Sequence, residues 1–452
     1  MKIAVIGGAG VRTPLLINGL THSDLPIDRI ALYDDDHERL SIIGRVAELM
    51  AARPATLREP RGRPEQGRGA TGSGRRVELC ASVADCVSGA DFVFTSIRVG
   101  GMAQRIHDEA AAQRHGIVGQ ETVGPAGFAM AARTIPHMVR YAREIDRVAP
   151  SAWIINFTNP VGMVTEAMRT ASRRVIGICD TPTELFEDVA RALGLRSEEC
   201  HFDYFGLNHL GWLREVYCGG VPQFHRLWRD PERLRAIYRV PLFDPSFLQE
   251  LKLLPTEYVY YYDQPARAFE NVRRAGQSRG QVIESLTTSL FEALKAPCVD
   301  SIKVYNAYLA ARSAGYMQIE SGSASPMTLP PPSGLAGYDR IALAVIRAVH
   351  FNLNAVIPLS VANHGNIPDL LEDDVVEVPC VVNANGARPM HAGAAPGRVR
   401  ALLMNVKEYE RRTVRAALAQ SSDGARDALT ANPLVPNAAT ADRLLADLSP
   451  LW

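Results

Sequence analysis

The sequence predicts an α/β fold, a parallel β-sheet covered by helices and followed by a mostly helical α+β substrate domain. Over roughly the first 180 residues, short apolar runs that suit buried strands alternate with stretches of helical spacing. This alternation indicates a parallel sheet, because parallel strands are joined by helical crossovers. Beyond residue 182 helical patterns dominate, with occasional β-like runs such as 375–382. A chain of 452 residues is long enough for two domains, which we expect at 1–182 and 183–452.

The elements of the first domain follow from local patterns. Apolar runs between turn residues predict strands at Lys2–Ile6, Arg29–Tyr33, Asp91–Ser96, Trp153–Phe157 and Val175–Cys179. Helical spacing predicts the intervening helices, such as Pro14–Leu20, His37–Met50 and Met130–Val148. Residues 53–76 interrupt the alternation with seven Arg, two Glu and many Gly and Pro, so we expect a solvated surface excursion there.

Charge and hydropathy exclude two classes of partner. The chain has 49 Lys+Arg and 49 Asp+Glu, and this balance argues against a nucleic-acid-binding protein. The basic segment 53–76 could contact nucleic acid, but a plain solvated loop is the favoured interpretation. No apolar run reaches the ~18 residues that span a bilayer, so no membrane association is expected. An apolar strand and glycines directly follow Met1-Lys2 without a signal-peptide pattern, and the seven Cys lack C-x-x-C spacing. Together these features predict a cytoplasmic protein with free thiols.

A glycine-rich turn follows the first predicted strand. Residues 7–14 read Gly-Gly-Ala-Gly-Val-Arg-Thr-Pro, and Asp34 ends the second predicted strand. Glycines such as Gly7, Gly8 and Gly10 let the backbone approach a pyrophosphate, and an acidic residue at the position of Asp34 can bind an adenosine ribose. The combination predicts a Rossmann-type domain like that of lactate and malate dehydrogenases, which would bind NAD rather than NADP. The alternative is a turn that only tightens a flavodoxin-like fold.

Two segments further along carry groups that suit a ligand. Arg98 follows the predicted strand at 91–96, where open α/β sheets bind anionic or polyhydroxy ligands; a surface arginine is the alternative. Glu121 lies in the segment Gly119–Gly127, where many polar and turn-forming residues precede a helix. This segment is either a binding loop, in which Glu121 acts on the pKa of a neighbour, or a plain connection.

An amide, a thiol and a carboxylate meet at the next two strand ends. Asn159 follows one strand, and Cys179 and Asp180 follow the next, with His209 about thirty residues later in the chain. Cys and His are possible metal ligands, but spacing alone favours a buried Cys and a capping His.

The segment Pro255–Tyr262 contains four tyrosines. Their spacing is helical, so an aromatic packing stripe is the default interpretation. A tyrosine that acts as a catalytic base would need a nearby cation to lower its pKa.

Together and in this order, these segments resemble the NAD- and metal-dependent glycosidases of glycoside hydrolase family 4. The matching segments run along nearly the whole chain: Gly7–Pro14, Arg98–Gly101, His115–Thr122, Asn156–Pro160, Cys179–Pro182, Gly206–Gly211, Pro255–Tyr262 and Val375–Cys380. One departure lies in the first segment. The family's commoner turn begins Gly-Gly-Gly-Ser, with small or aromatic residues where this chain has Val11-Arg12.

The resemblance implies a role for each candidate residue. NAD would be held by Gly7, Gly8, Gly10 and Asp34. Cys179 and His209 would bind a divalent metal, Mn²⁺ in most of the family, although thiolate and imidazole alone would suggest Zn²⁺. Tyr258 would take the C2 proton of the sugar, Glu121 would raise the basicity of Tyr258, and Asp180 would donate a proton. Substrate would be bound by Arg98, Asn159 and Arg279.

The resemblance also implies the reaction and its substrate. Hydride transfer from C3 of the sugar to NAD would give a ketone and make the C2 proton acidic. Removal of the C2 proton would then expel the C1 substituent. Addition of water and return of the hydride would complete a hydrolysis. The glycine turn favours a 6-phospho-β-glucoside as substrate, whereas Cys179–Pro182 is nearer to 6-phospho-α-glucosidases, which are the alternative. A 2-hydroxy-acid dehydrogenase and a non-catalytic sugar-phosphate sensor are more distant alternatives. A homodimer or homotetramer is expected.

Overall fold

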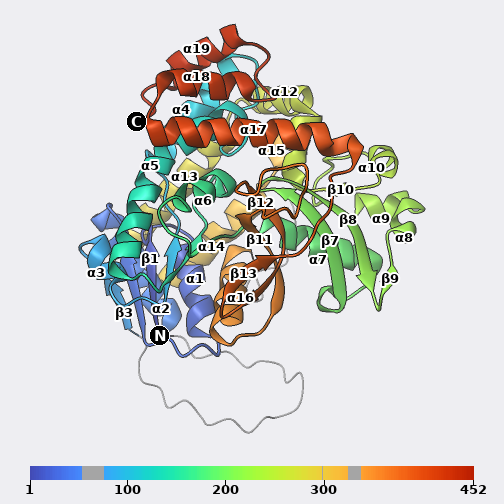
Figure 1. The fold of residues 1–452 in the computed structure, drawn as a ribbon. Helices are drawn as coiled ribbons and strands as arrows, with labels where there is room; N and C mark the ends of the chain where they lie inside the picture. The colour runs from blue at the N-terminus through green and yellow to red at the C-terminus, as the bar shows by residue number, and fades with distance from the viewer. Residues whose placement is uncertain (53–75, 298, 324–336) are drawn as a thin grey trace.

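The first half of the chain folds into a parallel β-sheet flanked by helices (Figure 1). The computed structural model describes residues 1–52, 76–297, 299–323 and 337–452, so the predicted excursion at 53–76 lies outside the described residues except for Arg76. Five strands match the predicted ones: β1 (Lys2–Ile6), β2 (Arg29–Tyr33), β4 (Phe92–Thr95), β5 (Trp153–Asn156) and β6 (Val175–Gly177). A sixth strand, β3 (Arg76–Leu79), was missed because it has only two apolar residues and adjoins the Arg-rich segment.

The strands of this half lie in the order β6-β5-β4-β1-β2-β3, and every neighbouring pair is parallel. β1 and β4 are buried along their whole length, as central strands with helices on both faces must be. The chain changes direction across the sheet between β1 and β4, and sheets of this kind bind ligands beyond the carboxyl ends of their strands at that point. The predicted Rossmann-type fold is therefore confirmed.

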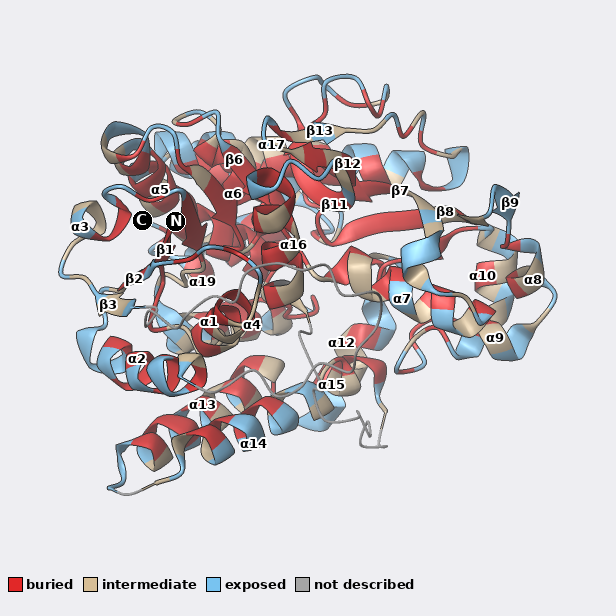
Figure 2. Ribbon diagram, turned by 90° about the horizontal axis from the view of Figure 1, so that it is seen from below, coloured by how far each residue is buried: buried red, intermediate tan, exposed pale blue. Residues whose placement is uncertain are grey.

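The helices of this half bury their apolar sides against the sheet and against one another (Figure 2). They are α1 (Thr13–Thr21), α2 (His37–Ala51), α3 (Val83–Val87), α4 (Gly101–Arg114), α5 (Gly124–Val148), α6 (Val161–Met168) and α7 (Thr181–Leu193). The three helices named from the sequence are α1, α2 and the larger part of α5. The α5 helix starts six residues before the predicted Met130, because the loop around Glu121 leads directly into it.

The second half of the chain extends the same sheet. Strands β11 (Ala355–Ala362), β12 (Val375–Asn383) and β13 (Gly386–Pro389) continue it antiparallel from β6, beginning at the pair Ser360 and Gly177. The β-like run predicted at 375–382 is β12. Because the sheet runs across residue 182, a division into two domains at that residue stays a prediction.

A smaller sheet lies beside the first and was not foreseen in the helical pattern of the second half. It comprises β7 (Cys200–Leu207), β8 (Leu210–Cys218), β9 (Val221–Pro222) and β10 (Leu254–Pro255). β7 and β8 form an antiparallel hairpin whose two-residue turn is Asn208-His209. The hairpin thereby fixes the position of one predicted metal ligand.

Helices make up most of the remainder. Those before the gap at 324–336 are α8 (His225–Trp228), α9 (Pro231–Arg235), α10 (Pro245–Leu251), α11 (Tyr260–Asp263), α12 (Pro265–Ala275), α13 (Arg279–Lys295), α14 (Ser301–Ala314) and α15 (Gln318–Ser321). Those after it are α16 (Tyr338–His350), α17 (Gly397–Ala419), α18 (Ser422–Ala431) and α19 (Ala438–Leu448). Helices α13 and α14 share a buried cluster with α2 that includes Ile43, Leu290 and Tyr305, so they are fastened beside the glycine turn.

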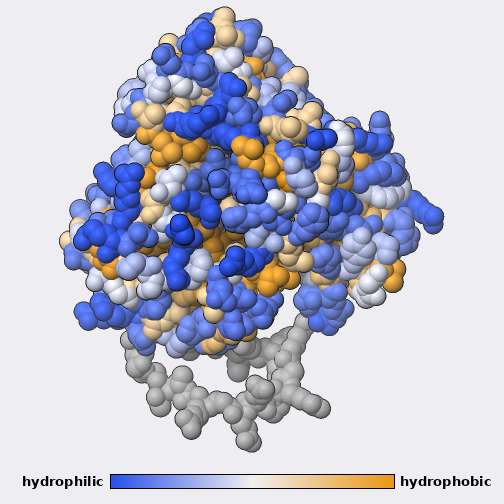
Figure 3. All heavy atoms as spheres, in the orientation of Figure 1, coloured by the Kyte–Doolittle hydropathy of each residue, from blue (hydrophilic) through white to orange (hydrophobic). Residues whose placement is uncertain are grey.

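The outer surface is mainly hydrophilic on the face shown in Figure 3, where hydrophobic residues form smaller groups. Within the described ranges, none of the helices combines the length and the apolar character that crossing a membrane requires.

Candidate active site

One cavity gathers all but one of the residues that the sequence singled out. It has a volume of about 700 Å³ and lies beyond the carboxyl ends of β1, β4, β5 and β6. Its lining includes Gly7, Gly10, Asp34, Arg98, Glu121, Asn159, Cys179, Asp180, His209, Tyr258 and Arg279. Gly8 is the exception, because it backs onto Leu32 and Leu40, which a Cβ at this position would approach to 3.0 Å.

The glycine turn is folded tightly against the ends of two strands. Gly7 has φ +93°, and a side chain there would collide with the carbonyl oxygen of Ser96. The N–H groups of Gly7 and Gly8 donate to the carbonyl oxygen of Tyr33 at 2.9 and 2.8 Å. The helix begins at Thr13 with Arg12 at its N-cap, and Arg12 is one of the residues that line the cavity.

Asp34 lies beside this turn at the end of β2. Its Oδ2 accepts a hydrogen bond from the backbone N–H of Ala9 at 3.0 Å, and its Oδ1 accepts one from Asp36 at 3.0 Å. Burial raises the pKa of Asp34, and these two hydrogen bonds oppose the shift. The carboxylate is thus held in one orientation beside the backbone that would carry a pyrophosphate, the arrangement that a dinucleotide requires.

Cys179 and His209 reach the cavity from different sheets. Cys179 lies just beyond β6, and His209 occupies the β7–β8 turn with φ +64°, a conformation that few non-glycine residues adopt. The Nδ1 atom of His209 lies 2.9 Å from the hydroxyl of Thr122. This contact orients the ring and leaves Nε2 as the nitrogen available to a metal.

The donor atoms of this pair fit a divalent cation. Burial lowers the pKa of His209 to about 4, which keeps the imidazole neutral, the form that ligates metals. Burial also raises the pKa of the Cys179 thiol, and the nearby charges of Glu377 and Asp180 add to the shift, so only a nearby cation would favour the thiolate. Among the described residues no group of three His, Cys or carboxylate side chains forms a complete metal site. A cation held by the pair would therefore keep coordination positions open to substrate oxygens and water.

Tyr258 lies flat against the imidazole of His209. The two ring centroids are 3.8 Å apart and the rings are inclined by 3°. The Tyr258 oxygen lies 3.4 Å from the hydroxyl of Tyr316, which donates to Oε1 of Glu257 at 2.9 Å. The hydroxyl of Tyr316 is thus placed to donate to the carboxylate or to the Tyr258 oxygen, and it links the two groups. The three side chains form a line from the phenol to the carboxylate.

Proton affinities along this line are shifted upward. Burial raises the pKa of Glu257 to about 7, and the charge of Asp180 adds to the effect. Burial raises the pKa of Tyr258 well above its usual value, with further contributions from the charges of Glu257 and Glu121. Tyr258 is therefore a phenol rather than a phenolate unless a cation is nearby, and the role predicted for Glu121 stays a prediction.

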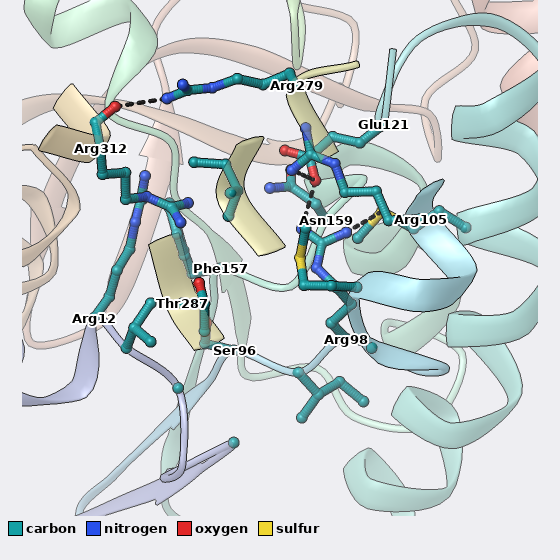
Figure 4. A pocket seen from close by; sticks show the side chains of 18 of the residues that line it. Arg12, Ser96, Arg98, Arg105, Glu121, Phe157, Asn159, Arg279, Thr287 and Arg312 are labelled. Atoms are coloured by element: carbon teal, nitrogen blue, oxygen red, sulfur yellow. Dashed lines mark hydrogen bonds and ion pairs between the residues drawn. The ribbon is translucent and has the colours of Figure 1, made fainter. Parts of the chain in front are cut away.

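Glu121 is held by two arginines (Figure 4). Its Oε2 lies 2.5 Å from Arg98 and 2.7 Å from Arg105. Burial disfavours the charged carboxylate, but the charges of Arg105 and Arg98 outweigh it and lower the pKa of Glu121. Arg98 is thus not a free surface arginine, since Glu121 fixes its guanidinium at the cavity wall.

The other predicted substrate contacts present polar groups to the cavity. The Oδ1 of Asn159 is buried and has no hydrogen-bond partner among the described residues, which suits an acceptor that waits for a ligand. Arg279 donates from Nη2 to the carbonyl oxygen of Arg312 at 2.6 Å. Asp180 lies with its Oδ2 3.9 Å from Nη1 of Arg12.

The cavity also holds functional candidates that the sequence did not reveal. They are Arg12, Arg105, Glu184, Glu257, Arg312 and Tyr316. Glu257 stood next to the candidate base in a segment already singled out, so the sequence held a signal for it. Arg105, Arg312 and Tyr316 come from ordinary helical stretches or their ends, and only the fold brings them to the site.

Family models match most of the chain. "Family 4 glycosyl hydrolase" matches residues 65–195, and "Family 4 glycosyl hydrolase C-terminal domain" matches residues 204–435. A probable 6-phospho-beta-glucosidase of Bacillus subtilis is 30% identical, over 99% of this chain and 95% of the relative. The phospho-alpha-glucosidase PagL of Clostridium acetobutylicum is 26% identical, over 99% of this chain and 96% of the relative.

A solved structure matches the whole of this chain. The 6-phospho-beta glucosidase of Thermotoga maritima, solved with NAD and glucose-6-phosphate, has a TM-score of 0.80 and 26% sequence identity, covering 100% of this chain and 98% of that one. Another structure of that protein contains manganese, NAD⁺ and glucose-6-phosphate and has a TM-score of 0.79.

Proposed function

The chain belongs to family 4 of the glycosyl hydrolases, and from that membership we propose that it hydrolyses 6-phospho-β-glucosides with NAD and a divalent cation, Mn²⁺, as cofactors. The observation that carries the proposal is the stack of Tyr258 on His209, in a cavity that also contains Cys179 and the glycine turn. An ordinary glycosidase needs two carboxylates and neither a dinucleotide site nor a Cys/His pair.

The residues present suit both cofactors. Gly7, Gly10 and Asp34 would hold NAD, and Cys179 with His209 would hold the cation. When bound, these groups would supply reversible hydride transfer at C3 of the sugar and Lewis-acid polarisation of its C2 and C3 oxygens. The chain itself must then orient the sugar, remove the C2 proton and protonate the leaving group.

Tyr258 is the proposed base for the C2 proton. Its own proton would pass to Tyr316 as the Tyr316 proton passes to Glu257, so the phenol gains basicity without releasing charge to solvent. Glu257 suits the accepting role, because burial places its pKa at about 7, near the pH at which a general base works best. Glu121, with its two arginines, would hold a further negative charge near enough to Tyr258 to raise its pKa.

Asp180 is the proposed proton donor to the leaving group. Glu184 lines the same cavity, and burial together with the charge of Asp180 raises its pKa to about 8. A protonated Glu184 at neutral pH is thus a nearby source of the proton that Asp180 would deliver.

The substrate follows from the relatives and from the arginines. The chain resembles both 6-phospho-β- and phospho-α-glucosidases, and the higher identity is to the former. Arg98, Asn159 and Arg279 are the proposed contacts to a phosphorylated sugar, since guanidinium groups match phosphate geometry. A 6-phospho-α-glucoside is the second candidate. The α- and β-glucosides share the glucose-6-phosphate unit that the Thermotoga structure contains, so that ligand does not distinguish them.

The test is a panel of nitrophenyl α- and β-glucosides, with and without 6-phosphate, assayed with NAD, Mn²⁺ and a thiol reductant. The 6-phospho-β-glucoside should be cleaved fastest, and cleavage should stop after chelation and removal of nucleotide. Cys179→Ser should lose metal-dependent turnover, whereas Cys86→Ala, at a buried thiol away from the cavity, should keep it. Full activity without metal or nucleotide would contradict the proposal.

We further propose that the protein is cytoplasmic and assembles as a homodimer or homotetramer. The cytoplasmic location is proposed because the substrate is phosphorylated and because Cys179 must stay reduced to bind a metal. Fractionation of cells tests this location. Light scattering of the purified protein tests the second.

A further inference from the structure

One loop of the cavity folds back on itself beside the proposed metal site. Gln120 and Val123 are joined by an isolated antiparallel bridge, which makes the segment 120–123 a tight turn. Gly127 on α5 packs against this turn, because a Cβ there would lie only 2.4 Å from the carbonyl carbon of Thr122. Gln120 and Thr122 are both buried. The turn therefore holds two polar side chains in place, and the proposed reaction leaves their role open.

Three hydrogen bonds connect Gln120 to the imidazole of His209. The Oε1 atom of Gln120 accepts from the backbone N–H of Thr122 at 2.7 Å and from the hydroxyl of Thr122 at 2.9 Å. The same hydroxyl oxygen lies 2.9 Å from Nδ1 of His209. Because a backbone N–H can only donate, the atom of the Gln120 amide that faces Thr122 must be its oxygen. The series of contacts thus begins at an acceptor whose identity the backbone fixes.

The Thr122 hydroxyl has one proton and two neighbours that could accept it. The Gln120 oxygen carries no proton, so the two oxygens attract each other only when Thr122 donates to Gln120. The Thr122 oxygen then presents a lone pair to His209, and Nδ1 must carry the ring proton to complete the third contact. Donation from Thr122 to Nδ1 would instead leave the two oxygens facing each other without a proton. Only the first arrangement satisfies all three contacts, and it leaves the lone pair of the neutral ring on Nε2.

We propose that Gln120 is a positioning residue that acts through Thr122 to hold His209 in its Nδ1–H tautomer; this inference rests on the proposed function, in which His209 binds the cation. A metal binds the imidazole nitrogen that has no proton, so the other tautomer would have to move its proton before Nε2 could bind. Partners of this kind, which touch a ligand but not the metal, change metal affinity about ten- to hundredfold when they are replaced.

The tautomer can be measured in the metal-free protein with nitrogen-15-labelled histidine. NMR distinguishes the protonated from the bare nitrogen of a neutral imidazole, and His209→Gln assigns the signals by their loss. Wild type should carry the proton on Nδ1. Gln120→Met, which keeps a long side chain but lacks the oxygen, should free the Thr122 proton for Nδ1 and raise the share of the Nε2–H form. Thr122→Val should also raise that share, because it removes the acceptor of the Nδ1 proton, whereas Thr122→Ser keeps the hydroxyl and should resemble wild type.

Mn²⁺ binding supplies the second measurement. Electron paramagnetic resonance of free Mn²⁺ gives the affinity without turnover, and Gln120→Met should weaken it roughly ten- to hundredfold. The control Thr288→Val, at an exposed position of α13, should match wild type in both measurements. A merely structural role of Gln120 would lower the melting temperature of Gln120→Met and leave the tautomer unchanged.

Three results would overturn the inference. They are a wild-type protein with the proton on Nε2, a Gln120→Met variant with the wild-type tautomer, and a Gln120→Met variant whose Mn²⁺ affinity stays within twofold of wild type. Neither measurement involves substrate. A protein that shows the expected tautomers and Mn²⁺ affinities but cleaves no glycoside would therefore count against the proposed function alone.

Discussion

Single residues of the site owe their chemistry to burial. His209 stays neutral because burial lowers its pKa to about 4, and Glu257 gains proton affinity because burial raises its pKa to about 7. Tyr258 lies between them, with its ring against the imidazole and its hydroxyl linked through Tyr316 to the carboxyl. The proposed ligand of the cation and the proposed acceptor of the proton thus both contact this phenol or its hydrogen-bond partner.

Tyr258→Phe should abolish cleavage and leave NAD binding intact. The reason is that the variant lacks the oxygen proposed to take the C2 proton but keeps the ring that stacks on His209. Wild type turned over in D₂O should give product with deuterium at C2, measured by NMR, and the variant should give none. Efficient hydrolysis by wild type without deuterium at C2 would rule out proton removal at that carbon.

Glu257→Gln should flatten the pH dependence of stability. The folded carboxyl, with a pKa of about 7, keeps a proton that the unfolded carboxyl, with its ordinary value of 4.5, has lost. The contribution of Glu257 to the free energy of unfolding is therefore fully present below pH 4.5 and is lost as the pH rises through 7. At 1.36 kcal/mol per unit of pKa shift, the loss is up to about 3 kcal/mol.

Denaturant unfolding of the metal-free protein at pH 5.5 and 7.5 measures this effect. Wild type should lose more stability over the interval than Glu257→Gln, and the exposed control Glu250→Gln should behave like wild type. Identical pH dependence in wild type and Glu257→Gln would show that the carboxyl is already ionised at pH 5.5.

At the scale of elements, the β7–β8 hairpin positions His209, the proposed metal ligand. Gly211 on β8 leaves room for the hydroxyl of Tyr204 on β7, which donates to Glu377 of β12 at 2.8 Å. Glu377 also accepts from Asn208 at 3.2 Å, beside His209 in the turn. The hairpin is thus tied to the large sheet by a carboxylate next to the proposed metal site.

Gly211→Ala should loosen this tie. Its Cβ would collide with the Tyr204 hydroxyl, which we expect to cost about 1–3 kcal/mol of stability and to weaken Mn²⁺ binding. Thermal unfolding and a Mn²⁺ titration measure the two effects. Gly397→Ala, where nothing lies within 4 Å of the added carbon, is the matched control and should change neither. A stable variant with normal Mn²⁺ affinity would show that the hairpin is not what holds His209.

At the scale of the whole molecule, the cavity joins parts that are distant in sequence. The glycine turn lies at residues 7–10, the thiol of the proposed metal site at 179 and the proposed base at 258. A dinucleotide in this cavity would contact the first strands of the sheet and the helices fastened beside them. Because the dinucleotide would bind the folded chain and not the unfolded one, it should stabilise all of these parts together.

NAD should raise the unfolding free energy by about 2.7 kcal/mol at a hundredfold excess over its Kd. Thermal unfolding with increasing NAD should show a melting temperature that climbs with concentration. Asp34→Ala should reduce that rise, because the carboxylate beside the glycine turn is lost, and the exposed control Asp427→Ala should not. A melting temperature unaffected by NAD would mean that the turn does not bind the dinucleotide.

Most of the sheet could be predicted because its strands are short apolar runs with turn residues at their ends. β3 and the second sheet were missed, since β3 has few apolar residues and the helical segments around the hairpin dominate that half of the chain. The site residues could be named where they lie at strand ends or resemble family motifs. Tyr316 and Arg312 could not be named, because they belong to stretches whose pattern is only that of a helix and its end.

The sequence by itself determined the parallel sheet, the dinucleotide turn, the family and the residues that would carry its chemistry. Those features are local or follow in a fixed order along the chain, so they can be read without knowing how the chain folds. Only the tertiary structure decided which proton affinities shift, that Glu257 and Tyr316 extend the line from Tyr258, and that Thr122 contacts His209. These properties depend on burial and on charges brought together from distant segments, because electrostatic interactions act through space and not along the chain.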